Sequence, residues 1–179
     1  MSGCSEKRPS KDEYYLGIAK AVAKRSTCLR RKFGAIVTKD DVVVSSGYNG
    51  STRGVINCSE IGCLKDEVNA SEYSEYEFCI AVHAEENVVI NAARNGSSTL
   101  GGTLYVYGEY TKDGSITESI PCERCRRVII NAGIRSVITK KSDGSIKRKN
   151  VSDWVKEDTQ RYIERLEEAK KKKQLPGRE

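Results

Sequence analysis

The sequence has little of what a membrane-spanning or secreted protein needs. Among 179 residues there are three prolines, one tryptophan, one methionine and one histidine. No stretch approaches the roughly 20 apolar residues of a membrane span. The opening segment, MSGCSEKRPSKDE, lacks the apolar core of a secretory signal. We therefore expect a cytoplasmic protein without a membrane partner.

Disulfide bonds are not expected either, although the chain has seven cysteines. Disulfides are rare in the cytosol, and an odd count argues against a purely bridged framework. Such cysteines favour metal binding or chemistry. The length predicts one domain, residues 1–179, with a core at about 10–170 and flexible tails at 1–9 and 171–179.

Positive charge is present but is not gathered on one segment. The net charge of +6 comes from 31 Lys and Arg residues mixed with 25 Asp and Glu residues. A nucleic-acid interface needs a clustered basic patch. The one strong cluster, Lys170–Lys173, favours a solvated helix end. The composition argues against a nucleic-acid partner and suits an anionic small molecule.

Apolar periodicity predicts alternating helices and strands. Ser10 and Glu13 form a capping box before an apolar stripe, which indicates a first helix. The β-branched runs 33–38 and 41–47 favour a hairpin. Residues 48–78 form a long polar segment, and such a loop in a small domain is usually functional or tied by a metal.

The second half continues the alternation. The predicted helices are 83–96, 121–133 with Pro121 in the first turn, and a charged amphipathic helix from Ser152; the predicted strands are 103–107 and 134–139. An Asp113–Gly114 turn suggests a small hairpin within 108–120. The order α-β-β-α-β-α-β-α predicts an α/β fold, a three-layer α-β-α sandwich with a mixed central sheet.

One histidine and two cysteines are candidate metal ligands. Cys122 and Cys125 are three residues apart at a predicted helix start, where the dipole and free N–H groups favour thiolates. His83 is the one imidazole available as a third ligand. Two thiolates and one imidazole leave a position open, as in catalytic zinc sites. The alternative readings are a closed structural zinc site and buried free thiols.

Glu85 is the candidate proton carrier beside this metal. Residues two apart in mid-helix point about 200° away from each other, so His83 and Glu85 approach one metal only at a helix start. A carboxylate next to the metal can move a proton between a water molecule and a leaving group. The combination H-A-E and P-C-E-R-C is the H-x-E…P-C-x-x-C pattern of zinc deaminases of nucleobases.

These motifs resemble the cytidine/deoxycytidylate deaminase superfamily, and within it the deoxycytidylate (dCMP) deaminase branch that includes the ComE-operon proteins. The resemblance runs from about Thr27 to about Thr139, through TCLRRKFGAIVTKDDVVVSSGYNGS, HAEENVVINAARNGSS and PCERCRRVIINAGIRSVI. It implies a cytidine deaminase-like fold, one catalytic Zn²⁺ and hydrolytic conversion of dCMP to dUMP and ammonia. Family members are commonly oligomeric and often respond to dCTP and dTTP, which implies a homo-oligomer with such effectors.

The resemblance also implies roles for individual residues. His83, Cys122 and Cys125 fall on the zinc ligands and Glu85 on the proton shuttle. Asn49, Ala84 and Arg94 fall on positions near the substrate sugar, the pyrimidine and the nucleotide site, and Arg53 is a further candidate for a phosphate contact. A solvated loop arginine is the plainer interpretation of Arg53.

The remaining cysteines suggest a second, structural zinc. Cys28 and Cys58 match positions that carry one in some members, and Cys63 and Cys79 are near enough in sequence to complete four thiolates. Free buried thiols are the alternative, because the spacing lacks two regular C-x-x-C knuckles.

Substrate choice is left open by the sequence. The segment 108–120 is about ten residues longer than in many members, and it lies where a pocket mouth is expected. The alternative substrates are another base or nucleoside, and a polynucleotide such as tRNA or single-stranded DNA. A further alternative is that the protein is not an enzyme and binds two zinc ions as an interaction protein. A shuttle such as Glu85 argues against the last, because a structural site needs none.

Overall fold

Five strands form the central sheet of the protein. The computed structural model describes residues 7–70 and 76–174. The strands lie in the order β2-β1-β5-β6-β7 and span Arg31–Lys39 (β1), Val42–Tyr48 (β2), Thr103–Tyr110 (β5), Ser136–Lys140 (β6) and Ile146–Asn150 (β7). β5 and β6 are parallel and the other neighbouring pairs are antiparallel. The predicted mixed sheet is therefore confirmed.

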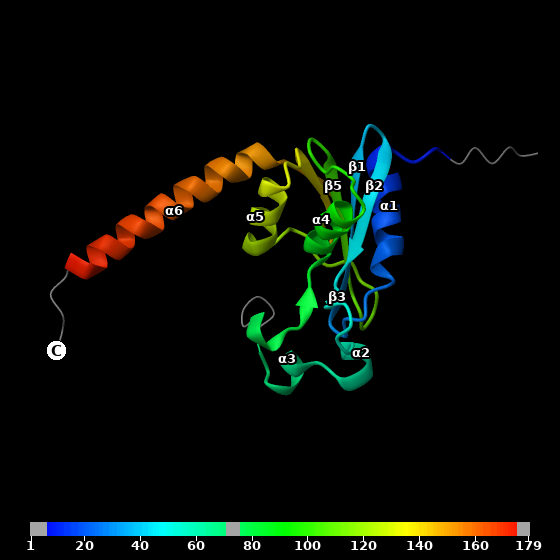
Figure 1. Ribbon diagram of the computed structural model, residues 1–179, viewed down its shortest axis with the longest axis horizontal. Helices are drawn as coiled ribbons and strands as arrows, with labels where there is room; N and C mark the ends of the chain where they lie inside the picture. The colour runs from blue at the N-terminus through cyan, green and yellow to red at the C-terminus, as the bar shows by residue number, and fades with distance from the viewer. Residues whose placement is uncertain (1–6, 71–75, 175–179) are drawn as a thin grey trace, which may run out of the picture.

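Helices cover both faces of this sheet (Figure 1). Helix α1 (Lys11–Ala23), which begins with the predicted capping box, covers one face, and α4 (Ala84–Arg94) and α5 (Glu123–Asn131) cover the other. Alternate residues of each strand point to opposite faces. Ile36 and Tyr105 therefore pack with α1, while Ala35 and Leu104 pack with α4 and α5. The α-β-α sandwich is confirmed.

Two local predictions need correction at α5 and at the end of the sheet. Helix α5 begins at Glu123, so Pro121 precedes the helix and does not lie in its first turn. Strand β7 was not predicted. Its sequence, IKRKN, has one apolar residue, because an edge strand with mostly exposed side chains has no core face to fill.

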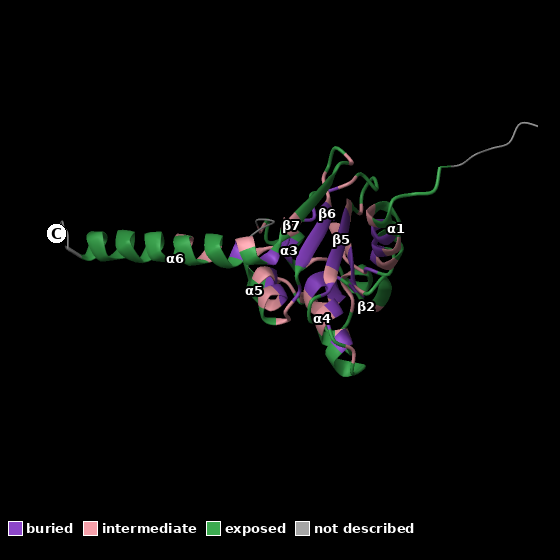
Figure 2. Ribbon diagram, turned by 90° about the horizontal axis from the view of Figure 1, so that it is seen from above, coloured by how far each residue is buried: buried purple, intermediate pink, exposed green. Residues whose placement is uncertain are grey.

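The last helix is longer than expected. Helix α6 (Val151–Gln174) includes residues 171–174, which were assigned to a tail, while residues 1–6 and 175–179 lie outside the described residues. Figure 2 shows α6 projecting from the body, with exposed residues along its outer part. None of the described helices combines the length and apolar content that a membrane crossing requires.

The polar segment after β2 contains short elements. A two-stranded sheet joins β3 (Gly50–Ser51) and β4 (Ala81–Val82), and between them lie α2 (Cys58–Ile61), α3 (Leu64–Glu67) and the 3₁₀ turn η1 (Tyr76–Phe78). The small hairpin predicted within 108–120 is present, since Tyr110 N–H donates to the Ser115 carbonyl across the Asp113–Gly114 turn.

Candidate metal centre and pocket

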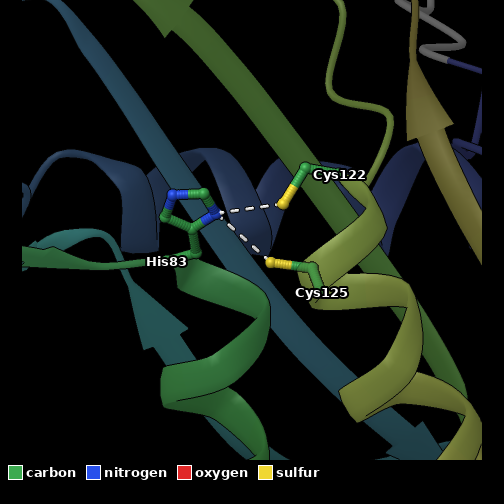
Figure 3. A group of neighbouring side chains, drawn as sticks. All are labelled: His83, Cys122 and Cys125. Atoms are coloured by element: carbon green, nitrogen blue, oxygen red, sulfur yellow. Dashed lines mark hydrogen bonds between the residues drawn. The ribbon is translucent and has the colours of Figure 1, made fainter. Parts of the chain in front are cut away.

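The starts of two helices meet at the centre of the candidate site. His83 is the residue directly before α4, and Cys122 is the residue directly before α5. Cys125 lies in the first turn of α5 and is fully buried. Figure 3 shows the imidazole of His83 facing both sulfur atoms. The predicted convergence at a helix start is therefore present.

The distances among these three side chains fit a zinc ion. His83 Nδ1 lies 3.3 Å from Cys125 Sγ and 3.6 Å from Cys122 Sγ. All three ligand atoms lie within 4.8 Å of one another. Zn–N and Zn–S bonds of about 2.0 and 2.3 Å at a tetrahedral angle place N and S about 3.5 Å apart. The donor types and the two nitrogen–sulfur distances therefore fit a zinc ion with three protein ligands.

The ligands also have the electrostatics of a metal site. The Cys125 thiol donates to Cys122 and, with His83, lowers the pKa of Cys122 to about 3. The hydrogen bond to Cys122 raises the pKa of His83, and the bond to Cys122 together with burial raises the pKa of Cys125. A thiolate is therefore already favoured at Cys122, and thiolates are the metal-binding form of cysteine.

Glu85 is a buried carboxyl group next to this centre. Its exposed fraction is 7%, and burial raises its pKa, while His83 counteracts that shift. It lines the same pocket as His83 and Cys122. By contrast, Glu86 accepts hydrogen bonds from the His83 backbone N–H and from Arg124, so it fixes the helix start. The two adjacent glutamates thus have different surroundings, and only Glu85 lies in the pocket.

A close contact between β2 and α4 sets the position of His83 and Glu85. A Cβ atom added at Gly47 would lie 2.4 Å from the Val88 backbone nitrogen and 2.8 Å from the Ala84 carbonyl oxygen. Only glycine permits this approach. Asn87 and Asn91 donate from their side chains to the carbonyl groups of Tyr48 and Ser46, which ties α4 to the strand.

Asn49 and Ala84 line the pocket, as the resemblance implied for residues near the substrate. The Asn49 side chain accepts a hydrogen bond of 2.7 Å from Phe33 N–H and donates one of 2.9 Å to the Arg31 carbonyl. It therefore holds β1 against the turn after β2. The remaining acceptor and donor capacity of its amide is what a ligand can use.

Three cations in the pocket were not singled out from the sequence. Arg30, Arg31 and Lys65 line it together with the ligands and Glu85. Lys65 is only 6% exposed, and Arg30 forms an ion pair of 3.3 Å with Asp66. Arg30 and Arg31 lie in the TCLRR motif, which was the available signal for both, whereas Lys65 lies in an irregular segment whose path the sequence does not indicate.

Arg53 and Arg94 lie together in a different recess. They line it with β2 and the end of α4, and Arg53 donates a hydrogen bond of 2.6 Å to Asn91. Neither residue lines the pocket that contains His83 and Glu85. The structure therefore separates these two candidates from the other predicted substrate residues.

The four cysteines of the second set are near one another, but their sulfur atoms do not form a compact group of metal ligands. The thiol of Cys58 has its pKa raised first by burial and then by the neighbouring thiols of Cys63, Cys28 and Cys79. Among the described residues these four do not form a group with all ligand atoms within 4.8 Å, in contrast to His83, Cys122 and Cys125. Cys28 and Cys79 also line the main pocket.

Taken together, the fold and the site define an α/β protein with a candidate metal centre of one histidine and two cysteines beside a buried carboxyl group. The chain belongs to the family described as the cytidine and deoxycytidylate deaminase zinc-binding region, whose model matches residues 9–141. This match includes the three ligands, Glu85 and all four cysteines of the second set.

Individual relatives support the same branch of the family. The chain is 40% identical over 139 residues to a deoxycytidylate deaminase of Mycobacterium phage D29, covering 75% of this chain and 97% of the relative. It is 34% identical over 131 residues to the deoxycytidylate deaminase of Schizosaccharomyces pombe, covering 73% of this chain but only 37% of that longer protein. The match therefore spans little more than a third of the yeast relative.

A solved structure has the same architecture. The dCMP deaminase of cyanophage S-TIM5, determined in complex with dCMP and dUMP, superimposes with a TM-score of 0.56 at 27% identity. The superposition covers 78% of this chain and 90% of the cyanophage chain. The cytidine deaminase-like fold expected from the sequence is thus confirmed.

Proposed function

We propose that the protein is a zinc-dependent aminohydrolase that converts dCMP to dUMP and ammonia. The observation that carries this proposal is the pocket in which the buried carboxyl of Glu85 lies beside the His83–Cys122–Cys125 centre. The deoxycytidylate deaminase relatives and the nucleotide complex of the cyanophage enzyme support the choice of substrate. A structural zinc site would not need a buried carboxyl group beside it.

Each residue has a defined part in this reaction. Zinc, when bound by the three ligands, supplies Lewis-acid activation of a water molecule. Glu85 takes a proton from the attacking water, whose oxygen bonds to C4 of the cytosine. Glu85 gives this proton to N3, then takes the second proton from the new hydroxyl on C4 and passes it to the amino group. The C4–N bond breaks as the C4 carbonyl forms, so that water and cytosine become uracil and ammonia. The raised pKa of Glu85 suits a group that both accepts and donates protons.

We assign the substrate phosphate to the cations of the pocket. Arg30, Arg31 and Lys65 share the pocket with Glu85, whereas Arg53 and Arg94 line the other recess. Arginine forms paired hydrogen bonds with phosphate oxygens. Asn49 and the Ala84 backbone line the same pocket and remain the candidates for the sugar and the base.

A substrate panel tests the proposal. The zinc-loaded protein is incubated with dCMP, CMP, deoxycytidine and cytidine, with and without dCTP or dTTP, and ammonia is measured. We expect dCMP to be preferred, and a change with dCTP would identify the nucleotide as an effector. Ammonia release from nucleosides alone, or from single-stranded oligonucleotides alone, would contradict the assignment of dCMP.

We also propose that Cys28, Cys58, Cys63 and Cys79 hold a second, structural zinc ion. The mutual influence of their thiols supports this assignment, because four thiolates are a typical structural zinc set. The ion would tie the segment that carries Cys58, Cys63 and Cys79 to Cys28, which precedes β1. Zinc content measured by elemental analysis, with and without a Cys58→Ser change, tests it.

A further inference from the structure

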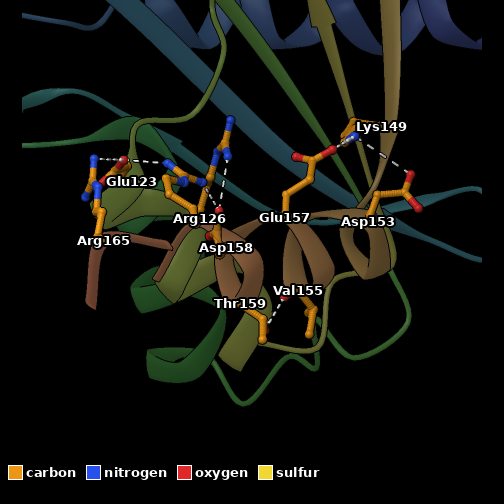
Figure 4. A network of polar contacts seen from close by, with 10 residues as sticks. Glu123, Arg126, Lys149, Asp153, Val155, Glu157, Asp158, Thr159 and Arg165 are labelled. Carbon is orange, nitrogen blue, oxygen red and sulfur yellow. Dashed lines mark hydrogen bonds and ion pairs between the residues drawn. The ribbon is translucent and has the colours of Figure 1, made fainter. Parts of the chain in front are cut away.

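Helix α6 has one half that packs against the domain and one half that does not. In the first half, Val151 and Trp154 are buried, and the Arg126 guanidinium lies 4.9 Å from the Trp154 ring centroid. Arg126 also pairs with Asp158 at 3.4 Å (Figure 4). Arg161 pairs with Glu123 at 2.5 Å. These contacts fix the direction in which the helix leaves the body.

The second half extends beyond these contacts. Every residue from Tyr162 to Lys173 is exposed, and Arg165 makes a long ion pair of 3.8 Å with Glu123. A helical segment of about twelve exposed residues is marginal in water, since most helical stability in proteins comes from packing an apolar face. Among the described residues, this part of α6 therefore lacks the apolar packing that normally stabilises a helix.

An apolar stripe runs along the exposed side of α6. We define the α6 stripe by the five residues Val155, Thr159, Tyr162, Leu166 and Ala169. Their spacing of four, three, four and three residues is the heptad spacing of paired helices. Val155, Tyr162 and Leu166 are 46%, 70% and 43% exposed. The Thr159 hydroxyl donates to the Val155 carbonyl, so it is satisfied within the helix.

The α6 stripe is distinct from the side of α6 that contacts the domain. At about 100° per residue, the five stripe positions lie within a sector of about 80°. The side that contacts α5 carries Trp154, Asp158, Arg161 and Arg165, and it is centred about 90° away. A second helix can therefore pack along the stripe without displacing α5.

The distribution of charge along α6 indicates which kind of partner packs on the α6 stripe. Six acids and three bases lie between Asp153 and Glu168, and four lysines follow at Lys170–Lys173. Two copies of α6 running in the same direction would place their lysine runs side by side. Two copies running in opposite directions place each lysine run near the acidic part of the other. An anionic membrane or nucleic acid would meet the six acids along most of the same surface.

We propose that two copies of this chain associate through antiparallel packing of their α6 stripes. The paired helices would remove Val155, Tyr162 and Leu166 from water, and the opposed charges would set the direction. This assignment is independent of the proposed reaction, because the α6 stripe lies outside the pocket.

Analytical ultracentrifugation of the zinc-loaded protein tests the proposal. The variant Tyr162→Glu with Leu166→Glu should halve the associated mass or weaken association at least about tenfold, since each change buries a charge in the pair. The matched control, Lys156→Gln with Gln160→Glu, makes the same change in net charge away from the stripe and outside the lysine run, and should leave the mass unchanged. Zinc content and circular dichroism verify that both variants fold.

Several results would overturn the proposal. A wild-type protein that is monomeric at tens of micromolar would do so, as would equal masses for wild type and the stripe variant. Retention on anionic vesicles or oligonucleotides without a change in mass would assign the stripe to a different occupant. Salt tests the direction: antiparallel pairs weaken as salt rises, and tighter association at high salt would contradict that arrangement.

Discussion

The two cysteine-containing regions of this protein differ in how they are held. His83, Cys122 and Cys125 sit at the starts of two helices that pack on a buried sheet, and their ligand atoms lie within 4.8 Å of one another. Cys58 and Cys63 sit at short helices joined by irregular chain, and the second set does not reach that compactness.

The difference shows what holds the ligands of each site in position. Burial of Val88, Ile129 and neighbouring core residues fixes the first site, and its ligands follow from the positions of the helices. The second region has exposed apolar residues, such as Ile61 and Leu64, and little core of its own. We infer that a metal would contribute more to the stability of the second region than to that of the first, whose ligands lie on helices held by core packing.

The largest expected effect comes from removing one ligand at each site. Cys125→Ser should lower zinc content by one ion and reduce ammonia production from dCMP to background, because the catalytic centre loses a ligand. Cys58→Ser should also lower zinc content by one ion but keep measurable turnover and reduce the melting temperature. Zinc content, ammonia release and thermal unfolding are measured on both variants. Equal loss of activity with unchanged zinc in Cys58→Ser would remove the distinction between the sites.

Much of the first site was predictable because its chemistry is local. His83 and Glu85 are two residues apart, Cys122 and Cys125 are three apart, and each pair marks a helix start. Only the approach of the two helices is long-range. The pocket cation Lys65 was missed because no periodicity guides the path of the irregular segment that carries it.

The strand missed from the fold has a similar explanation. The Asp143–Gly144 pair before β7 is a turn signal, and Lys141 N–H does donate to the Ser145 carbonyl across it. The residues after this turn do not alternate between apolar and polar, because β7 is an exposed edge strand, and so the strand was not predicted. Arg94 shows the reverse case, because its position in a motif suggested a place near the nucleotide site, whereas it lines a recess other than the pocket of His83 and Glu85.

A smaller effect is expected when the proton carrier is changed and the ligands are kept. Glu85→Gln should lower kcat for dCMP by about 10²- to 10⁴-fold, the range for loss of a general acid–base group. Zinc content should be unchanged, because Glu85 is not among the three ligands. Glu86→Gln is the control, since that side chain bonds the His83 backbone and Arg124. Wild-type turnover in Glu85→Gln would refute the assigned role.

The next effect concerns the contact that preorganises the first site. Gly47→Ala places a methyl group against the backbone of α4, and such overpacking costs about 1–3 kcal/mol. The control Gly17→Ala has no heavy atom within 4 Å and lies in α1, where alanine stabilises a helix by about 0.5–1 kcal/mol. Urea unfolding should therefore move in opposite directions for the two variants. A neutral Gly47→Ala would mean that α4 is not tightly set against β2.

The smallest effect is expected far from both cysteine sets. Ser10 accepts a hydrogen bond from Glu13 N–H at the start of α1, which lies on the face of the sheet opposite α4 and α5. Ser10→Ala should lower the free energy of unfolding by about 1 kcal/mol, the usual value of a helix cap, and leave zinc content and turnover unchanged. Ser142→Ala, in the exposed turn before β7, is the matched control and should be neutral. A loss of zinc in Ser10→Ala would show that the first site depends on α1 as well as on the two helices that carry its ligands.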